Sequence, residues 1–247
     1  MTRTITDRYE RDLQRRHETG RPPRTRRPLP PLTYVPLSEH PLRRLPQLFA
    51  GLALYGFSLA LMIRSALGLS PWTVLNEGLM RRTPLSFGTI TAVVGGCVLL
   101  LWIPLRQRPK FGTVANIVVL AVASDLGLAL IPDHQPLPAR CCLLAAGIVL
   151  NALSIAIYVG ARFGPGPRDG LMTGASAASG RSIRLIRTLI EVAVLVAGWL
   201  LGGSVGAGTV LYALSVGPIT QFFLPWFAYG TRCVPRTWST GLEREPN

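Results

Sequence analysis

Two short stretches of similar sequence decide the fold: residues 68–78 read GLSPWTVLNEG, and residues 164–174 read GPGPRDGLMTG. Both follow the pattern Gly-x-x-Pro-x-x-x-Leu-x-x-Gly, and they lie 96 residues apart. At the same offset, Gly112-Thr113-Val114 matches Gly208-Thr209-Val210 without a gap. Weak internal similarity of this kind is the sequence signature of a duplicated architecture, so the chain is expected to consist of two related halves.

The composition predicts that both halves lie in a membrane. Apolar residues make up 49% of the 247 residues, whereas charged residues make up only 15%, well below the roughly 25% that is usual in soluble domains. The formal net charge is +14. The excess of arginine lies in the N-terminal tail and between apolar stretches, as membrane orientation requires, so we expect the lipid bilayer and not nucleic acid as the partner. The composition also argues against a soluble enzyme and a disulfide-rich secreted fold.

Six apolar stretches are long enough for transmembrane helices, since a span needs about 20 mostly apolar residues. Three fall in each half, and an odd number of spans makes two similar halves cross the membrane in opposite senses. The predicted fold is therefore an all-α integral membrane protein with six transmembrane helices in two inverted three-helix repeats, residues 45–132 and 139–228. The predicted spans are residues 45–63, 86–105, 112–131, 141–161, 183–201 and 208–228.

The segments outside the repeats predict the orientation. Residues 1–44 hold eleven arginines, five acidic residues and seven prolines, a composition typical of a disordered tail. Arginine is more frequent in the connections that would share a side with this tail, although residues 64–85 depart from the trend with three arginines. Because basic residues accumulate on the cytoplasmic side, residues 1–44 and the C-terminal tail, residues 229–247, are both expected in the cytoplasm, with the spans in a bacterial plasma membrane.

Each Gly-Pro stretch predicts a short helix that begins at its proline, because proline is favoured in the first turn of a helix. Ser70 and Gly166 would be the N-caps. A helix of about three turns is too short to cross a membrane, so two interpretations remain open. Either the helix re-enters the membrane with its N-terminus at a cavity, or it lies at the interface, where Trp72 would join the aromatic belt and Arg168 would meet lipid headgroups.

The re-entrant interpretation predicts a substrate site, because helix N-termini attract anions. The candidate substrate-binding residues lie in the two first turns, with one polar residue from the last span: Pro71, Trp72, Thr73, Gly166, Pro167, Arg168, Asp169 and Gln221.

Two acidic residues inside predicted spans are candidates for proton or ion coupling, because ionisable groups are costly in a membrane. Asp125 lies deep in the third predicted span, and Gln221 stands at the equivalent position of the sixth. Asp125 could instead reach the outer interface or pair with Arg140. Glu191 shares a helix face with Arg187 and Arg184, so a structural ion pair is the alternative to a coupling role.

The chain carries no recognisable catalytic motif and no cysteine or histidine spacing typical of a metal site. We therefore expect no enzymatic activity, no cofactor and no metal. Glycines at four-residue spacing favour close helix packing, within one chain or in a homo-oligomer.

Four motifs resemble the bacterial YczE/YyaS/YitT-type membrane proteins: Gly68-x-x-Pro-Trp-x-x-Leu, Gly164-x-Gly-Pro-Arg-Asp-Gly-Leu-Met, Ile183-Arg-x-x-Arg-Thr-x-x-Glu and Leu200-Leu-Gly-Gly-x-x-Gly-x-Gly-Thr. The resemblance covers about residues 43–228. It implies a multi-pass plasma-membrane protein with duplicated halves, and it carries no activity or functional residues with it. Similar proteins often have Pro-Trp-Asp in the first half, whereas this chain has Thr73 at the third position.

The leading hypothesis is a permease for a small anionic or zwitterionic solute, with its site between the two repeats. The alternative is a membrane scaffold or regulatory partner protein that transports nothing and uses its basic tail at anionic lipid.

Overall fold

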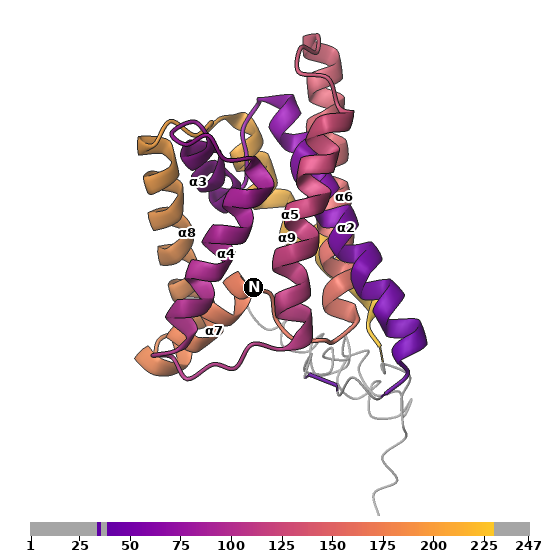
Figure 1. Ribbon diagram of the computed structural model, residues 1–247, viewed down its shortest axis with the longest axis vertical. Helices are drawn as coiled ribbons and strands as arrows, with labels where there is room; N and C mark the ends of the chain where they lie inside the picture. Colours follow the sequence, from indigo (N-terminus) through magenta and orange to yellow (C-terminus); the bar gives the residue numbers. More distant parts are fainter. Residues whose placement is uncertain (1–33, 36–38, 230–247) are drawn as a thin grey trace, which may run out of the picture. The chain divides into compact units, whose positions relative to one another are not determined.

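The computed structural model describes residues 34–35 and 39–229, and the predicted tails lie largely outside them. The described part is built from eight helices and contains no strand (Figure 1). Each predicted span falls on a helix, and both short helices begin at their prolines. The helices are α2 (Pro41–Ser65), α3 (Pro71–Met80), α4 (Phe87–Trp102), α5 (Phe111–Leu130), α6 (Leu137–Gly160), α7 (Pro167–Ser179), α8 (Ile183–Leu200) and α9 (Ala207–Phe227).

Several helix boundaries differ from the predicted ones, and α6 begins at Leu137, four residues before its predicted span. Helix α2 begins at Pro41, so residues 41–44 belong to the helix and not to the tail. Helix α4 ends at Trp102, three residues before the predicted end of its span. Pro104 follows two residues later, and a proline has no backbone N–H to continue the helical hydrogen bonds.

Four helices, α2, α5, α6 and α9, are long and apolar enough to cross a membrane. The remaining two predicted spans differ from these. Helix α4 has 16 residues and so rises about 24 Å, which is less than the thickness of a typical hydrocarbon core. Helix α8 has 18 residues but carries Arg184, Arg187 and Glu191, which lower its hydropathy.

The helices of the two halves begin at a constant spacing. Helices α2 and α6 begin at residues 41 and 137, α3 and α7 at 71 and 167, α4 and α8 at 87 and 183, and α5 and α9 at 111 and 207. Each pair is 96 residues apart, which is the offset found in the sequence. The repeated sequence therefore corresponds to repeated helices, including the two short ones.

Helices α2 and α6 pack side by side and run antiparallel, with equivalent contacts at their two ends. Arg44 at the start of α2 donates from Nε to the carbonyl of Ala161 just beyond α6, at 3.0 Å. Arg140 at the start of α6 donates from Nε to the carbonyl of Ser65 at the end of α2, at 2.7 Å. Each arginine thus supplies donors to the other helix's terminal carbonyls, which have no partner within their own helix.

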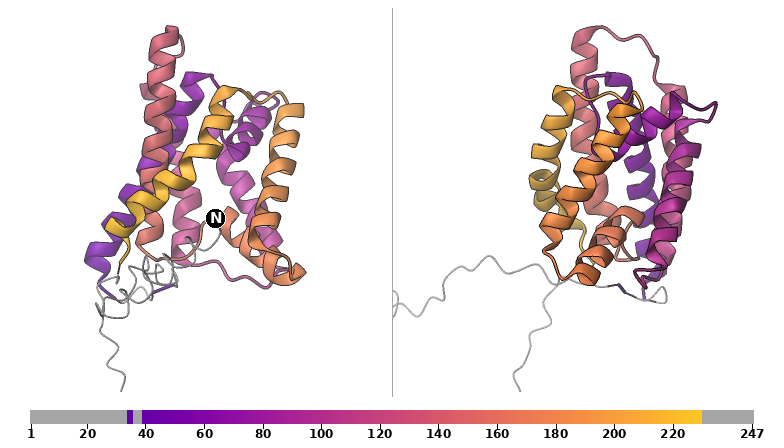
Figure 2. Two further views of the ribbon diagram at one scale, coloured as in Figure 1. Left: turned by 180° about the vertical axis from the view of Figure 1, so that it is seen from behind. Right: turned by 90° about the vertical axis from the view of Figure 1, so that its left-hand side faces the viewer.

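Two of the remaining contacts join elements of different halves, and others stay within one half. Helix α3 packs on α8 and helix α4 packs on α7, while α5 packs on α2 and α9 on α6 (Figures 1 and 2). The short helix of each half therefore rests on a long helix of the other half. The views also place α3 and α7 near opposite ends of the bundle.

Small residues permit this exchanged packing. A Cβ atom on Gly198 in α8 would lie 2.4 Å from the backbone nitrogen of Leu75 in α3. At the equivalent contact, a Cβ atom on Gly170 in α7 would lie 2.0 Å from the ring of Trp102 in α4. The glycine belongs to α8 in the first contact and to α7 in the second. The two contacts therefore fill equivalent space with different residues.

Candidate functional site

The first turn of α3 is held by its own cap. The Ser70 hydroxyl accepts a hydrogen bond from the backbone N–H of Thr73 and lies 2.6 Å from the Thr73 hydroxyl. Pro71 occupies the first helical position, as predicted. Trp72 is 7% exposed, and its buried Nε1–H has no hydrogen-bond partner among the described residues. A buried indole N–H normally has a hydrogen-bond acceptor, so an unpaired one is unusual.

The first turn of α7 is less completely capped. Gly166 occupies the N-cap position but has no side chain to accept from the helix amides. The carbonyl of Pro167 accepts from Nε1 of Trp102 at 3.0 Å, which fixes the start of α7 against α4. Arg168 and Asp169 follow at once, so a basic and an acidic side chain project from the N-terminus of this helix.

Arg168 and Trp72 meet across the two halves. The Arg168 guanidinium carbon lies 4.9 Å from the centroid of the Trp72 ring, a cation–π distance. The two residues are 96 positions apart and so are equivalent in the two halves. Among the described residues, the Arg168 guanidinium makes no hydrogen bond and no ion pair. The predicted site residues of α3 and α7 are thus brought together, although their helices lie near opposite ends of the bundle.

Asp169 points to a different set of side chains. Its Oδ2 accepts from the Tyr158 hydroxyl of α6 at 3.3 Å. Measured from an ideal Cβ position on Gly166, Asp169 Oδ2 lies at 3.4 Å and both Asn116 Nδ2 and the Tyr158 hydroxyl oxygen lie at 3.7 Å. Asn116 is 7% exposed, and no hydrogen bond joins its amide to any described residue. Three polar groups from three helices therefore surround the space beside Gly166.

Asn116 and Tyr158 are not among the residues that the sequence predicts for the site. Both lie within predicted spans, and an uncharged polar side chain there gives a much weaker signal than an acidic one. Their convergence on Gly166 also depends on how α5 and α6 pack against the start of α7, which no sequence spacing specifies.

Charged and aromatic groups of α8, α2 and α9 surround this cluster. Arg187 donates from Nε to Glu191 Oε1 at 2.9 Å, the i,i+4 pair that the spacing predicted. The Tyr55 ring stacks on the Tyr158 ring at 5.8 Å between centroids. Tyr212 donates to Asn151 Oδ1 at 3.0 Å, and Asn151 donates in turn to Ser58.

Opposing influences act on the pKa of the Asp169 carboxyl group. Protein packed around the carboxyl group raises this pKa above the usual range, although Asp169 as a whole residue is exposed. Arg187, the Tyr158 hydrogen bond and Arg168 act in the opposite direction, while Glu191 adds to the increase. Arg187 and Glu191 therefore lie close enough to influence the same carboxyl group.

The structure does not bring Asp125 and Gln221 into this cluster. Asp125 accepts from the Ser86 hydroxyl and from the Gly88 N–H, both at 2.6 Å, so it holds the first turn of α4. It does not pair with Arg140, which donates to the end of α2. Gln221 lies on the exposed surface of α9 and makes no side-chain hydrogen bond to a described residue. A coupling role for Asp125 or Glu191 stays a prediction.

We expect Asp125→Ala to lower the free energy of unfolding by about 1–2 kcal/mol, because the α4 amide and the Ser86 hydroxyl lose their acceptor. Chemical denaturation in detergent, followed by near-ultraviolet circular dichroism, would measure the change. Asp133→Ala in the exposed α5–α6 connection is the matched control and should change stability much less. Equal stabilities for both variants would contradict the capping role.

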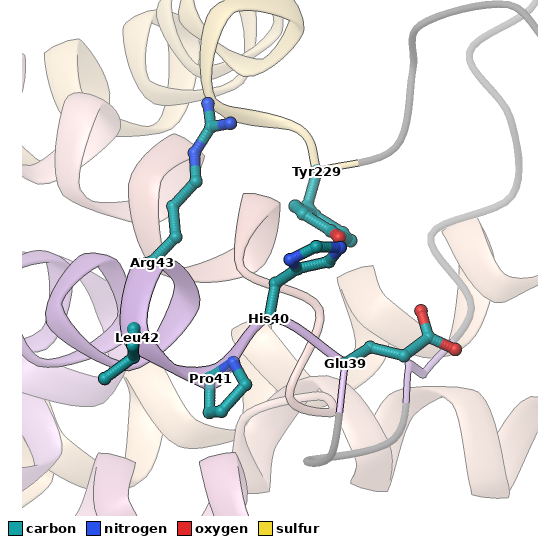
Figure 3. A pocket seen from close by; sticks show the side chains of 6 residues that line it. All are labelled: Glu39, His40, Pro41, Leu42, Arg43 and Tyr229. Carbon is teal, nitrogen blue, oxygen red and sulfur yellow. The ribbon is translucent and has the colours of Figure 1, made fainter.

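A hollow of about 640 Å³ lies elsewhere, at the start of α2 (Figure 3). His40 and Tyr229 face one another across it, with ring centroids 6.0 Å apart, while Arg43 points away. None of the predicted site residues lines it. The lining residues are Glu39, His40, Pro41, Leu42, Arg43 and Tyr229.

Comparisons with known proteins support the membrane assignment and leave the activity open. Residues 42–225 match the model of a family of unknown function, DUF6198. An uncharacterised protein of Haemophilus influenzae is 38% identical over 177 residues, which are 72% of this chain and 81% of that protein. The uncharacterised membrane protein YczE of Bacillus subtilis is 32% identical over 72% of this chain and 83% of its own length.

A third relative, the uncharacterised protein YyaS of Bacillus subtilis, is 27% identical over 71% of this chain and 89% of its own length. No solved structure is significantly similar. The predicted resemblance to YczE and YyaS is thereby confirmed. The long apolar helices and the name of YczE together make the chain an integral membrane protein.

Proposed function

The chain belongs to DUF6198, a family of unknown function, and from its own geometry we propose that it is a permease for a small anionic or zwitterionic solute. The proposed site lies between the two halves, where α3 and α7 direct Trp72 and Arg168 toward each other. This contact carries the proposal, because it joins the two short Gly-Pro helices that are the usual sequence pointer to a transport site.

The proposal includes six membrane spans arranged as two inverted repeats. In this arrangement α4 and α8 join the four longer apolar helices as membrane spans. The antiparallel α2–α6 pair supports the inversion, because equivalent helices of the two halves run in opposite directions. The exchanged contacts of α3 with α8 and of α4 with α7 support it as well.

We expect Thr83→Cys and Ser179→Cys to be labelled from opposite sides of the membrane. These exposed residues are 96 positions apart, near the ends of α3 and α7. In a chain whose native cysteines are replaced by serine, a membrane-impermeant maleimide added to intact cells should label Thr83→Cys. It should label Ser179→Cys only after the membrane is opened. Labelling of both from one side would contradict the inverted arrangement.

Uptake into proteoliposomes tests the permease directly. The full chain would be reconstituted and offered radiolabelled sulfate, phosphate, acetate and a mixture of amino acids in separate experiments. We expect saturable uptake of at least one of these probes, above that of protein-free liposomes. Arg168→Gln should abolish it, because the cation that faces the solute is lost.

The matched control for uptake is Arg181→Gln, since Arg181 is exposed beyond the other end of α7. This variant should transport at the wild-type rate. If folded wild-type protein gives no uptake of any probe, whichever way it is inserted into the liposomes, the permease proposal is wrong. The scaffold function would then be preferred, and the search would turn to protein partners.

A further inference from the structure

Two adjacent residues of opposite charge at the start of α7 face different partners. Arg168 lies over Trp72 of α3, whereas Asp169 contacts Tyr158 of α6. Neighbouring residues on a helix do not face each other, so the two charges do not neutralise one another directly. We propose that they bind the two ends of a small zwitterion, with a carboxylate at Arg168 and an ammonium group at Asp169. This inference rests on the proposed site between the halves and specifies the chemistry of its solute.

The Arg168 end suits a carboxylate. Arg168 is half-buried, and its guanidinium N–H groups have no acceptor among the described residues, while the guanidinium carbon lies 4.9 Å from the centroid of the Trp72 ring. A cation–π contact uses none of these N–H groups as hydrogen-bond donors, and two of them can donate parallel hydrogen bonds to a carboxylate. The buried Trp72 Nε1–H is a further donor without a partner in the described part of the chain.

The Asp169 end suits an ammonium group. The carboxylate has one long hydrogen bond, 3.3 Å from the Tyr158 hydroxyl, and keeps most of its acceptor capacity. Asn116 as a residue is more than nine-tenths buried, and its amide nitrogen lies beside the same space without a partner of its own among the described residues. Gly166 leaves open the space that the three groups surround, because a Cβ there would meet them only at ordinary contact distance.

The pairing of charges selects against ligands that carry a single charge. A simple anion would pair with Arg168 but would lie near the Asp169 carboxylate. A simple cation would pair with Asp169 but would lie near the Arg168 guanidinium. Arg187 and Glu191 already neutralise each other and add no net charge. A zwitterion compensates both unpaired charges at once, which matters because an uncompensated charge is costly inside a membrane protein.

Ligand-dependent thermal unfolding in detergent tests this inference with three matched sets of compounds. Each set contains an amino acid, the carboxylate that lacks its amino group and the amine that lacks its carboxyl group. The sets are alanine, propionate and ethylamine; leucine, 4-methylpentanoate and 3-methylbutylamine; and phenylalanine, 3-phenylpropionate and 2-phenylethylamine. We expect at least one amino acid to raise the unfolding temperature of the full chain, and neither of its single-charge analogues to do so.

The variants separate binding from folding. Arg168→Gln and Asp169→Asn should each weaken the apparent affinity for that amino acid by about tenfold or more, since each removes one charge-assisted contact. Gly166→Ala adds a methyl group that can be accommodated, so the protein should fold normally but bind more weakly. The controls Arg181→Gln and Asp133→Asn remove equivalent charges away from the cluster and should bind as the wild type does.

The outcomes distinguish this inference from the permease proposal. A carboxylate or an amine that stabilises the protein as strongly as the parent amino acid would overturn the zwitterion and leave a solute site in place. Stabilisation that persists in both Arg168→Gln and Asp169→Asn would overturn this location. Absence of any effect across the three sets would overturn the inference. An amino acid that binds but is not taken up by proteoliposomes would support the inference and contradict the permease proposal.

Discussion

Arg44→Met is expected to lower the free energy of unfolding by about 3 kcal/mol or more, which is a large part of the stability of a typical domain. Arg44 is completely buried, and its guanidinium lies 4.3 Å from the centroid of the Phe163 ring. Methionine would fill much of the space but would leave buried carbonyl groups without donors. The carbonyls that accept from Arg44 belong to Val35, Glu39, Ala161 and Arg162.

Equilibrium unfolding in mixed micelles, followed by tryptophan fluorescence, would measure this loss. Arg43→Met is the matched control, because Arg43 is the adjacent residue in the chain and its side chain is exposed. Arg140→Met should fall between the two, since Arg140 is half-buried and donates to the end of α2. If Arg43→Met and Arg44→Met lowered the free energy of unfolding equally, the loss would come from removing a basic residue and not from uncapping α6.

Gly198→Ala should destabilise the protein by about 2–3 kcal/mol, because the new methyl group has no room. Its Cβ would lie 2.4 Å from the nitrogen and 2.6 Å from the Cα of Leu75. These atoms belong to the backbone of α3, so relief requires α3 to move away from α8. Because α3 also carries Trp72, the same substitution should weaken solute binding.

Gly96→Ala in α4 provides the control for Gly198→Ala, because no atom lies within 4 Å of the position of its Cβ. This variant should be as stable as the wild type or slightly more stable, since alanine favours the helical conformation. The unfolding temperature in detergent and the yield of monodisperse protein would be measured for both. If both variants behaved alike, the close approach of α3 and α8 would not be a determinant of stability.

The sequence predicted the elements well because their signals are local. Proline at the first position and a capping residue before it are properties of a few consecutive residues, and α3 and α7 begin where these signals place them. The length of an apolar stretch is equally local. The repeat could also be recognised, because glycine and proline are kept where the backbone requires them. Gly68 and Gly164 illustrate this, since both have positive φ, 126° and 111°.

Much of the candidate site could not be predicted, because it depends on contacts between distant segments. Arg44 and Arg140 have the appearance of ordinary charges at membrane boundaries, and only the antiparallel packing of α2 and α6 shows that they cap each other's helix. Asp125 was a candidate for coupling because of its depth in a span, yet its neighbours Ser86 and Gly88 come from a different helix. Asn116 carries no charge, so only its position beside Gly166 makes it a candidate.

The exchange of short helices between the halves has a consequence for how the protein can change over time. Because α3 packs mainly on α8, and α7 packs on both α4 and α8, each short helix depends in part on a surface of the other half. A substitution in one half therefore has to fit the other half as well as its own. In α8, Gly198 leaves room for the backbone of Val74 and Leu75 in α3. At the other contact, Gly170 of α7 leaves room for the Trp102 ring of α4. Once such complementary differences exist, neither half can replace the other without a clash at these contacts.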